Sequence, residues 1–264
     1  MAIHFEQDGH VALVTIDRYE RRNAIDPEHA EALTAAWLRV RDDPEIRVAI
    51  VTGVKDAFCS GGDLKSLVGP IVERLGTGEA WTEEENAKRP SFTLRRLNIF
   101  KPIIAAVNGC CIAGGMELLG GTDIRLASAD ATFAVAEPRH GLIASGGTTA
   151  RLPRQLGWPA AMEILLTART FSAERALQLG LLNEVCAPGD LLHRARAWAE
   201  DIARLAPLAV QGTKRSALLG WRAGSVDEAL SIEDAVFREV FASEDAREGT
   251  RAFAEKRKPV WRGQ

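Results

Sequence analysis

The stretch PIIAAVNGCCIAGGME, residues 102–117, contains the change from strand to helix on which the predicted fold depends. Its first part, 102–107, is apolar and β-branched, which predicts a buried strand. The glycine-containing part, 108–113, predicts a turn, and residues 114–120 predict a short helix. Because this order of strand, glycine turn and helix recurs along the first half of the chain, the sequence predicts an α/β fold.

Other elements follow from the same kinds of signal. Asp8 and Gly9 separate two short apolar segments, which predicts a β-hairpin. Asp26 and Pro27 predict the start of a helix, as its N-cap and first-turn proline. We expect strands at 3–7, 11–16, 46–52, 102–107, 123–127, 132–136 and 182–186, and helices at 26–42, 91–100, 114–120, 191–205, 207–219, 226–241 and 244–256. The expected N-caps of the last helices are Asp190, Ser225 and Ser243.

The density of predicted strands divides the chain into two regions. After residue 145 strands nearly vanish, and helical periodicity dominates the C-terminal part. We therefore expect a core over residues 1–200 and a helical region over residues 201–264. Within the core, residues 69–89 break the rhythm with glycines and an acidic run, which predicts a mobile insertion.

Composition argues against several classes of function. The 264 residues are 46% hydrophobic and 26% charged, with a net charge of −3, so nothing favours nucleic-acid binding. The five histidines lack metal-ligand spacing, and the four cysteines fit neither a zinc site nor a disulfide framework. No apolar run approaches the ~20 residues of a membrane span, and no signal-peptide pattern opens the chain. We expect a soluble cytoplasmic protein without a metal site.

Two glutamates are the main candidates for chemistry. Glu117 follows the glycine turn, Glu137 closes a short apolar run, and both stand in uncharged sequence. Burial there would raise their pKa values toward the range that is useful for proton transfer. A structural role stays open for each: Glu117 as a helix-terminal acid, and Glu137 as a loop acid paired with Arg139.

Two glycine turns are candidate sites for a developing oxyanion. If Gly114 opens a helix, its free N–H can donate to such an oxygen. Gly62, in the turn 60–63, can supply the second donor that such a site needs. Both turns can equally be structural, with Asp63 as a helix cap. A third glycine turn, 145–148, is interpreted as structural.

Taken together, these segments resemble the enoyl-CoA hydratase/isomerase family, also called the crotonase superfamily. The resemblance covers almost the whole chain and rests on segments 22–25, 58–64, 102–117, 133–142, 147–157, 161–180 and 255–261. It implies a spiral core of repeated ββα units, with a C-terminal helical region that mediates a homotrimer or homohexamer. It also implies a lyase that hydrates 2-trans-enoyl-CoA to 3-hydroxyacyl-CoA. Such an enzyme needs no cofactor, because coenzyme A is part of the substrate.

The resemblance also implies roles for individual residues. The thioester oxygen would lie between the N–H groups of Gly62 and Gly114. Glu117 would activate a water molecule for attack at C3, and Glu137 would deliver a proton to C2. The residues expected to bind the coenzyme A moiety are Arg22, Ala24, Ser60, Gly62, Asp63 and Leu64. The acyl chain would be selected by the insertion, whose apolar residues suggest a pocket or a lid.

The chain departs from the family pattern at three points. Proline usually precedes the second glutamate, whereas here Ala136 precedes Glu137 and Pro138 follows it, a change that can re-aim this carboxylate. The stretch 143–147 is one residue shorter than in many relatives. Ala113 stands where glycine is frequent.

Other functions stay open at this point. An enoyl-CoA isomerase needs only one glutamate, so the presence of two favours the hydratase. Dehydration, decarboxylation, dehalogenation and thioester hydrolysis use the same oxyanion site with other side chains, and His140 beside Glu137 can matter for them. A non-catalytic member of the fold that binds RNA would be expected to show a lysine-rich helix or a lost glutamate, and this sequence has neither.

Overall fold

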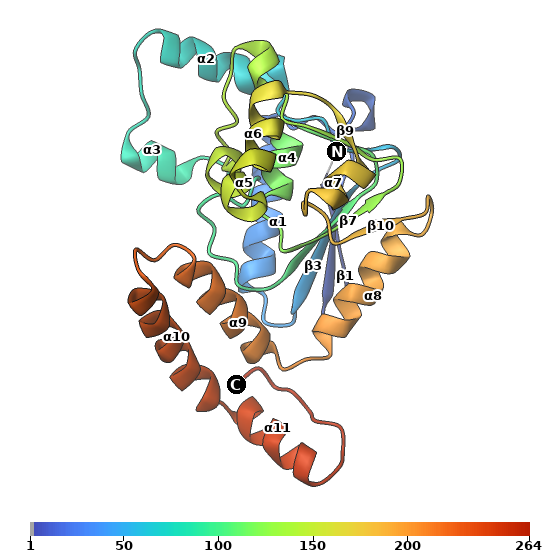
Figure 1. Cartoon of the computed structure of the whole chain (residues 1–264), viewed down its shortest axis with the longest axis vertical. Helices are drawn as coiled ribbons and strands as arrows, with labels where there is room; N and C mark the ends of the chain where they lie inside the picture. The colour runs from blue at the N-terminus through green and yellow to red at the C-terminus, as the bar shows by residue number, and fades with distance from the viewer. Residues whose placement is uncertain (1–2) are drawn as a thin grey trace.

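The computed structural model describes residues 3–264, apart from the side chain of Lys88, and arranges the strands in two sheets (Figure 1). The strands are β1 (Ile3–Asp8), β2 (Val11–Ile16), β3 (Val48–Gly53), β4 (Ala57–Cys59), β5 (Ile103–Val107), β6 (Cys110–Ile112), β7 (Ile124–Ser128), β8 (Thr132–Ala134), β9 (Phe171–Ser172) and β10 (Glu184–Cys186). One sheet has the order β1-β2-β3-β5-β7-β10, and the other has the order β4-β6-β8-β9.

Helices surround these sheets and extend beyond them. The α-helices are α1 (Pro27–Asp42), α2 (Gly69–Gly76), α3 (Glu83–Lys88), α4 (Gly114–Leu119), α5 (Thr148–Leu156), α6 (Trp158–Thr167), α7 (Ala173–Gln178), α8 (Leu191–Ala203), α9 (Pro207–Gly220), α10 (Val226–Phe241) and α11 (Glu244–Ala254). Short helical turns are η1 (Tyr19–Arg21), η2 (Leu64–Val68) and η3 (Glu137–His140). Among the described residues, no helix is both long and apolar enough to cross a membrane.

The chain winds as a spiral that adds one strand to each sheet per turn. β3 and β4, then β5 and β6, then β7 and β8 each place their first strand in the larger sheet and their second in the smaller one. Within each sheet these successive strands pair in parallel. The predicted α/β class and the spiral of strand pairs and helices are therefore confirmed. The predicted hairpin is confirmed as well, because β1 and β2 pair antiparallel.

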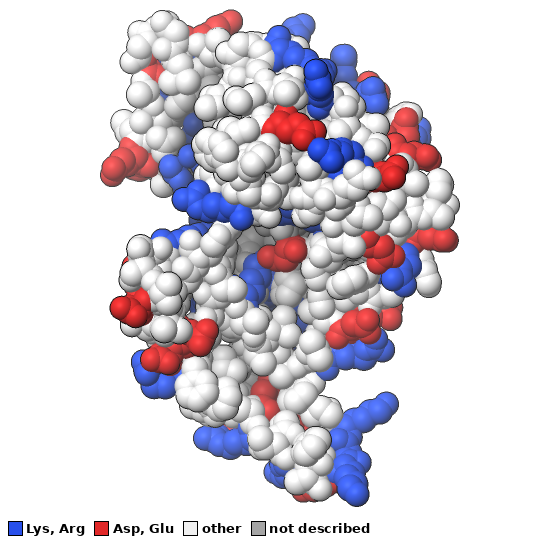
Figure 2. Space-filling view, in the orientation of Figure 1, with Lys and Arg blue, Asp and Glu red and all other residues white. Residues whose placement is uncertain are grey.

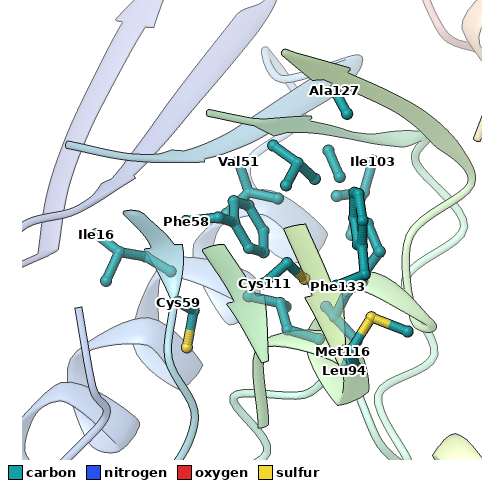
Figure 3. Packing of buried hydrophobic residues seen from close by; sticks show 14 of the residues in the cluster. Ile16, Val51, Phe58, Cys59, Leu94, Ile103, Cys111, Met116, Ala127 and Phe133 are labelled. Atoms are coloured by element: carbon teal, nitrogen blue, oxygen red, sulfur yellow. The ribbon is translucent and has the colours of Figure 1, made fainter. Parts of the chain in front are cut away.

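The central strands of the larger sheet, β3, β5 and β7, are buried on both faces. Alternate residues of its strands enter two different apolar clusters: Val51 packs between the two sheets, whereas its neighbour Ile50 packs under α8. Figure 3 shows the first cluster, in which Phe58 and Phe133 of the smaller sheet lie near Val51 and Ile103 of the larger one. This explains why the strands read as continuous apolar runs, as is typical of parallel sheets covered on both sides.

The turns between the two sheets stack closely on one another. A Cβ placed on Gly109 would lie 1.9 Å from the carbonyl oxygen of Asp56 in the preceding turn, so only glycine fits there. Asn108 links the same turns: its Oδ1 accepts from Gly53 N at 3.0 Å, and its Nδ2 donates to Lys55 O at 2.8 Å. The spacing of the spiral is thus set by direct backbone contact.

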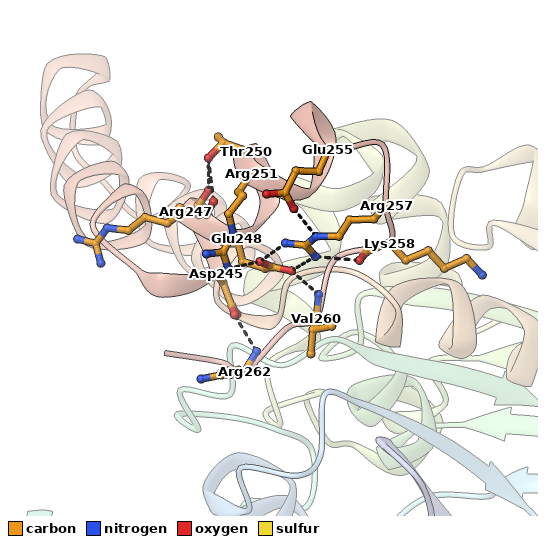
Figure 4. Close-up of polar contacts among 11 residues, drawn as sticks. Asp245, Arg247, Glu248, Thr250, Arg251, Glu255, Arg257, Lys258, Val260 and Arg262 are labelled. Atoms are coloured by element: carbon orange, nitrogen blue, oxygen red, sulfur yellow. Dashed lines mark hydrogen bonds and ion pairs between the residues drawn. The ribbon is translucent and has the colours of Figure 1, made fainter.

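The C-terminal helices form a lobe beside the sheets (Figure 1). α9 and α10 pack against each other, and α11 is tied to the end of the chain through buried Glu248. Glu248 accepts hydrogen bonds from Arg257, Arg251 and Val260 N, which hold its pKa well below the usual range (Figure 4). The predicted division at residue 200 stays a prediction. That residue lies in α8, which packs on the larger sheet.

Several local predictions were wrong. Residues 91–100 form turns instead of a helix, because Leu94 and Arg96 have φ angles of 59° and 62°, which no α-helix accommodates. The predicted turn 108–113 contains strand β6, and the insertion contains helices α2 and α3. Ser225 and Ser243 cap their helices as predicted, but the side chain of Asp190 makes no capping bond. Strands β4 and β9 and helices α5, α6 and α7 were not predicted from the sequence.

The stacked turns make a prediction about stability. Gly109→Ala is expected to lower the free energy of unfolding by about 2 kcal/mol or more, because backbone must move to admit the methyl group. Gly76→Ala is the control: nothing lies within 4 Å of its Cβ position, and we expect a change within about 1 kcal/mol. Urea unfolding measures both. Equal stabilities would show that the turns do not fix the spacing.

Candidate active site

The candidate site is a cavity of about 540 Å³ beside the ends of β4 and β6. Gly62, Gly114, Glu117 and Glu137 all line it, so the four predicted catalytic residues come together. Ser60 and part of segment 64–89 also line the cavity. The apolar lining residues of that segment are Leu64, Leu67, Val68, Ile71, Val72, Leu75 and Trp81.

Two backbone N–H groups lie side by side in this cavity. A Cβ on Gly114 would lie 3.1 Å from Gly62 N, and a Cβ on Gly61 would lie 3.3 Å from Gly114 N. Within residues 3–264, neither Gly62 N nor Gly114 N donates to a protein acceptor. Ala113, just before Gly114, has a φ of 50°, the region that favours glycine, which explains the family preference at this position. Two free donors in one cavity suit a developing oxyanion.

A half-buried ion network holds the first of these turns in place. Arg18 donates to Asp63 at 2.8 Å and pairs with Asp26 at 3.2 Å. Asp63 also accepts from the backbone N–H groups of Lys65 and Ser66, so it is the helix cap that the sequence suggests. Arg18 in particular holds the pKa of Asp63 at about 2. The Gly62 turn is therefore anchored to the start of α1.

Glu117 projects from α4 into the cavity and accepts a hydrogen bond from Gly146 N. Burial raises the pKa of Glu117, while the Gly146 bond and the charges of Arg151 and Arg95 act in the opposite direction. Its carboxylate thus points into the site and not at the end of its own helix. The structural alternative, an acid that only balances the helix dipole, is not what the side chain does.

Glu137 is buried, with 9% of its surface exposed. Its Oε2 has no hydrogen-bond partner among the described residues. Burial, together with the smaller effect of the neighbouring charge of Glu117, raises its pKa to about 7. Arg139 donates to Ala168 O instead of pairing with Glu137, so the alternative of a loop ion pair fails.

Pro138 does not turn Glu137 away from the cavity. It lies in the first turn of η3, where the absent N–H of proline would have no partner in any case. The departure from the family order of proline and glutamate is therefore compatible with a carboxylate that faces the cavity.

The residues predicted to bind coenzyme A are only partly brought together. Ser60, Gly62 and Leu64 line the cavity, whereas Arg22, Ala24 and Asp63 do not. Arg22 lies next to the lining, because its carbonyl oxygen accepts from Ser60 N at 3.1 Å. Ala24 contributes a carbonyl to Arg18 at 3.1 Å. These three residues lie outside the cavity lining and contact the turn 60–63 or its anchor Arg18.

Two residues of this site were not identified from the sequence. Gly146, interpreted as part of a structural turn, contacts Glu117 so closely that a Cβ would lie 2.3 Å from Glu117 Oε2. Arg151 donates to Glu117 O at 3.3 Å and to Thr93 O at 3.0 Å, which ties α4 to the turn after residue 92. A buried arginine on an otherwise ordinary helix gives no signal in one sequence, but the doubled glycine could have suggested close backbone approach.

Comparison with known proteins shows the family to which the chain belongs. A family model described as enoyl-CoA hydratase/isomerase matches residues 6–264. An (E)-benzylidenesuccinyl-CoA hydratase of Thauera aromatica is 38% identical over 264 residues and 100% of both chains. An enoyl-CoA hydratase of Mycobacterium tuberculosis is 39% identical over 255 residues, which cover 96% of this chain and 94% of that one. A crystal structure of an enoyl-CoA hydratase from the same organism superposes with a TM-score of 0.88 at 36% identity, covering 100% and 99% of the two chains.

The burial of Glu137 predicts a pH-dependent cost in stability. The pKa of its carboxyl is about 7 in the fold against an ordinary value of 4.5. Between these values the folded protein holds more protons than the unfolded chain, so stability falls as pH rises. Glu137→Gln removes this loss. Relative to wild type it should gain roughly 1–3 kcal/mol between about pH 4.5 and pH 8.

Urea unfolding at each pH measures this difference, with the exposed Glu174→Gln as the control. We expect the control to differ from wild type by the same small amount across the range. A Glu137→Gln difference that is equally flat would mean that Glu137 is not kept protonated by its surroundings.

Proposed function

We propose that this chain, which belongs to the enoyl-CoA hydratase/isomerase family, is an enoyl-CoA hydratase. It would add water to a 2-trans-enoyl-CoA and so form the 3-hydroxyacyl-CoA. One observation supports this above the others: two carboxylates with different surroundings share a cavity with two free backbone N–H groups. Hydration needs one group that takes a proton, one that gives a proton, and a site for the thioester oxygen.

The two N–H groups would bind the thioester carbonyl. With the oxygen held by Gly62 N and Gly114 N, negative charge on it is stabilised as the addition proceeds. This draws electrons from C3, which becomes open to attack by water, and gives C2 the character of an enolate carbon. Removal of one such donor typically costs ~10²–10³ in rate.

The surroundings of the two glutamates assign their roles. Glu117 accepts from Gly146 N and lies near Arg151, which favours its ionised form and suits a base that takes a proton from water. Burial and the charge of Glu117 raise the pKa of Glu137 to about 7, so that much of it carries a proton near neutral pH, which suits an acid. The water oxygen bonds to C3, its proton passes to Glu117, and the proton of Glu137 passes to C2.

The proposed reaction needs no redox cofactor, because addition of water leaves the redox state of the substrate as a whole unchanged. The two backbone N–H groups polarise the thioester carbonyl, a task that a metal ion performs in other enzymes. Coenzyme A enters as part of the substrate. The described chain has its four cysteines free and buried, and we place the protein in the reducing cytoplasm.

We also propose that the C-terminal helices mediate a homotrimer or a homohexamer. α10 exposes a row of large apolar side chains, with the rings of Phe237 and Phe241 4.1 Å apart. Val226 and Leu230 of the same helix are exposed as well. Apolar surface of this kind usually marks a contact with another chain.

The mechanism predicts that both glutamates are needed. Glu117→Gln and Glu137→Gln keep the shape of each side chain but remove its ability to exchange a proton. We expect each to lower kcat for crotonyl-CoA hydration by ~10²–10⁴. Loss of the enoyl-thioester absorbance on mixing measures the rate, and Glu174→Gln is the matched surface control.

Two results would contradict the proposal. Full activity in either glutamine variant would remove that residue from the mechanism. Unchanged absorbance with the wild type, despite tight binding of the acyl-CoA, would reject hydration itself. A shift of the double bond in a 3-enoyl-CoA would then identify an isomerase.

Gly146 should matter through the position of Glu117. Gly146→Ala would place a methyl group 2.3 Å from Glu117 Oε2, so the carboxylate must move. A displacement on the order of 1 Å can cost ~10² in rate, and we expect kcat to fall by about 10–100-fold with little change in KM. In a Glu117→Gln background the same substitution should cost almost nothing further. An equal loss in both backgrounds would point to a general disturbance of the fold.

A further inference from the structure

The cavity contains more positive charge than the proposed chemistry uses. Its charged lining residues are Arg89, Arg95, Arg96, Glu117 and Glu137, with His140 also present. Three guanidinium groups thus share the cavity with two carboxylates, of which Glu137 is only partly ionised near neutral pH. A hollow with such an imbalance attracts an anion.

None of the three arginines has a salt bridge or a side-chain hydrogen bond within the described part of the chain, but Arg89 stacks on Trp81, 4.0 Å from the centroid of its ring. Arg95 and Arg96 are exposed and have no such partner among the described residues. Arg74, nearby in the insertion, is different: it does not line the cavity and donates to both oxygens of Glu85 at 3.0 and 3.1 Å. Figure 2 shows basic side chains gathered between the α2–α3 segment and the C-terminal helices.

The unpaired arginines stand on a turn that is held in a strained conformation. Leu94 and Arg96 both have φ angles near 60°, which is uncommon for residues other than glycine. Arg151 fixes this turn by donating to Thr93 O and Leu94 O, each at 3.0 Å. Backbone strain of this kind persists where the surroundings impose it, often at ligand sites.

The same contacts link the turn to Glu117. Arg151 donates to Glu117 O as well as to the turn, and Thr93 Oγ1 donates to Gly146 O at 3.0 Å. The glycine donors would hold C1 of the substrate and Glu117 would act at C3. Because the turn lines the same cavity as Glu117 and the apolar residues Ile71 and Leu75, an acyl chain that extends from C3 along this cavity can reach it.

We propose that the acyl chain of the substrate ends in a carboxylate, which Arg95 and Arg96 bind. The substrate class is then the mono-CoA thioester of a 2-enedioic acid, with an apolar stretch between its two ends. Arginine pairs well with a carboxylate because its planar fork matches the two oxygens. This inference rests on the proposed hydratase function, since it names the substrate of that same site.

The test compares thioesters that differ only in their far end. Wild-type protein is given 2-enoyl-CoA and the matching 2-enedioyl-CoA over a series of chain lengths, and kcat/KM is measured from the loss of absorbance. At one or more lengths we expect the acid to be preferred about ten-fold or more. Arg95→Gln with Arg96→Gln should abolish that preference, and Arg74→Gln should keep it.

The outcomes separate the inference from the function on which it rests. If neutral chains react as well as acidic ones at every length, the carboxylate site is rejected and the hydratase stands. If the double variant weakens both substrates equally, the arginines act on what the two substrates share, the coenzyme A phosphates or the ionisation of Glu117, and the carboxylate site is again rejected. If neither substrate is hydrated at any length, the hydratase function fails and the inference fails with it.

Discussion

The close stacking of successive turns is the constraint on which the rest of this structure depends. Gly109 lets the backbone of its turn touch that of the preceding turn, and Asn108 links the same two turns with hydrogen bonds. This repeat places Gly62 and Gly114, which are far apart in sequence, within contact distance. The paired donors of the site are therefore a consequence of the spiral, and no separate element is needed to bring them together.

The acid and the base are separated by their surroundings, not by their chemistry. Both are glutamates in one cavity, and burial raises the pKa of each. Gly146 N and two nearby arginines counter this effect at Glu117, whereas Glu137 has an oxygen without any partner in the described structure. The ionised form of Glu117 in turn makes ionisation of Glu137 harder. The charge of the base Glu117 thus favours the protonated form of Glu137, which the acid needs.

Much of this could be predicted from the sequence, because its strands and glycine turns are local signals. The hairpin, the helix after Asp26 and the change at residues 102–117 depend on neighbours in the chain. The turn at Leu94 and Arg96 could not be predicted in this way. Its backbone is held by Arg151, a residue far along the chain, against the local preference for a helix. The contact of Gly146 with Glu117 was missed for the same reason, since the two residues are 29 positions apart in the sequence and only the fold brings them together.

Arg151 connects recognition with chemistry. Its guanidinium donates to Glu117 O, Thr93 O and Leu94 O, so the helix that carries the base and the turn that carries the unpaired arginines share one anchor. A second link runs from Thr93 through Gly146 to the Glu117 carboxylate, so the turn and the helix of the base are coupled by two routes. A substrate that engages the turn would steady the position of Glu117 as it binds, which converts binding at the far end of the acyl chain into alignment at C3.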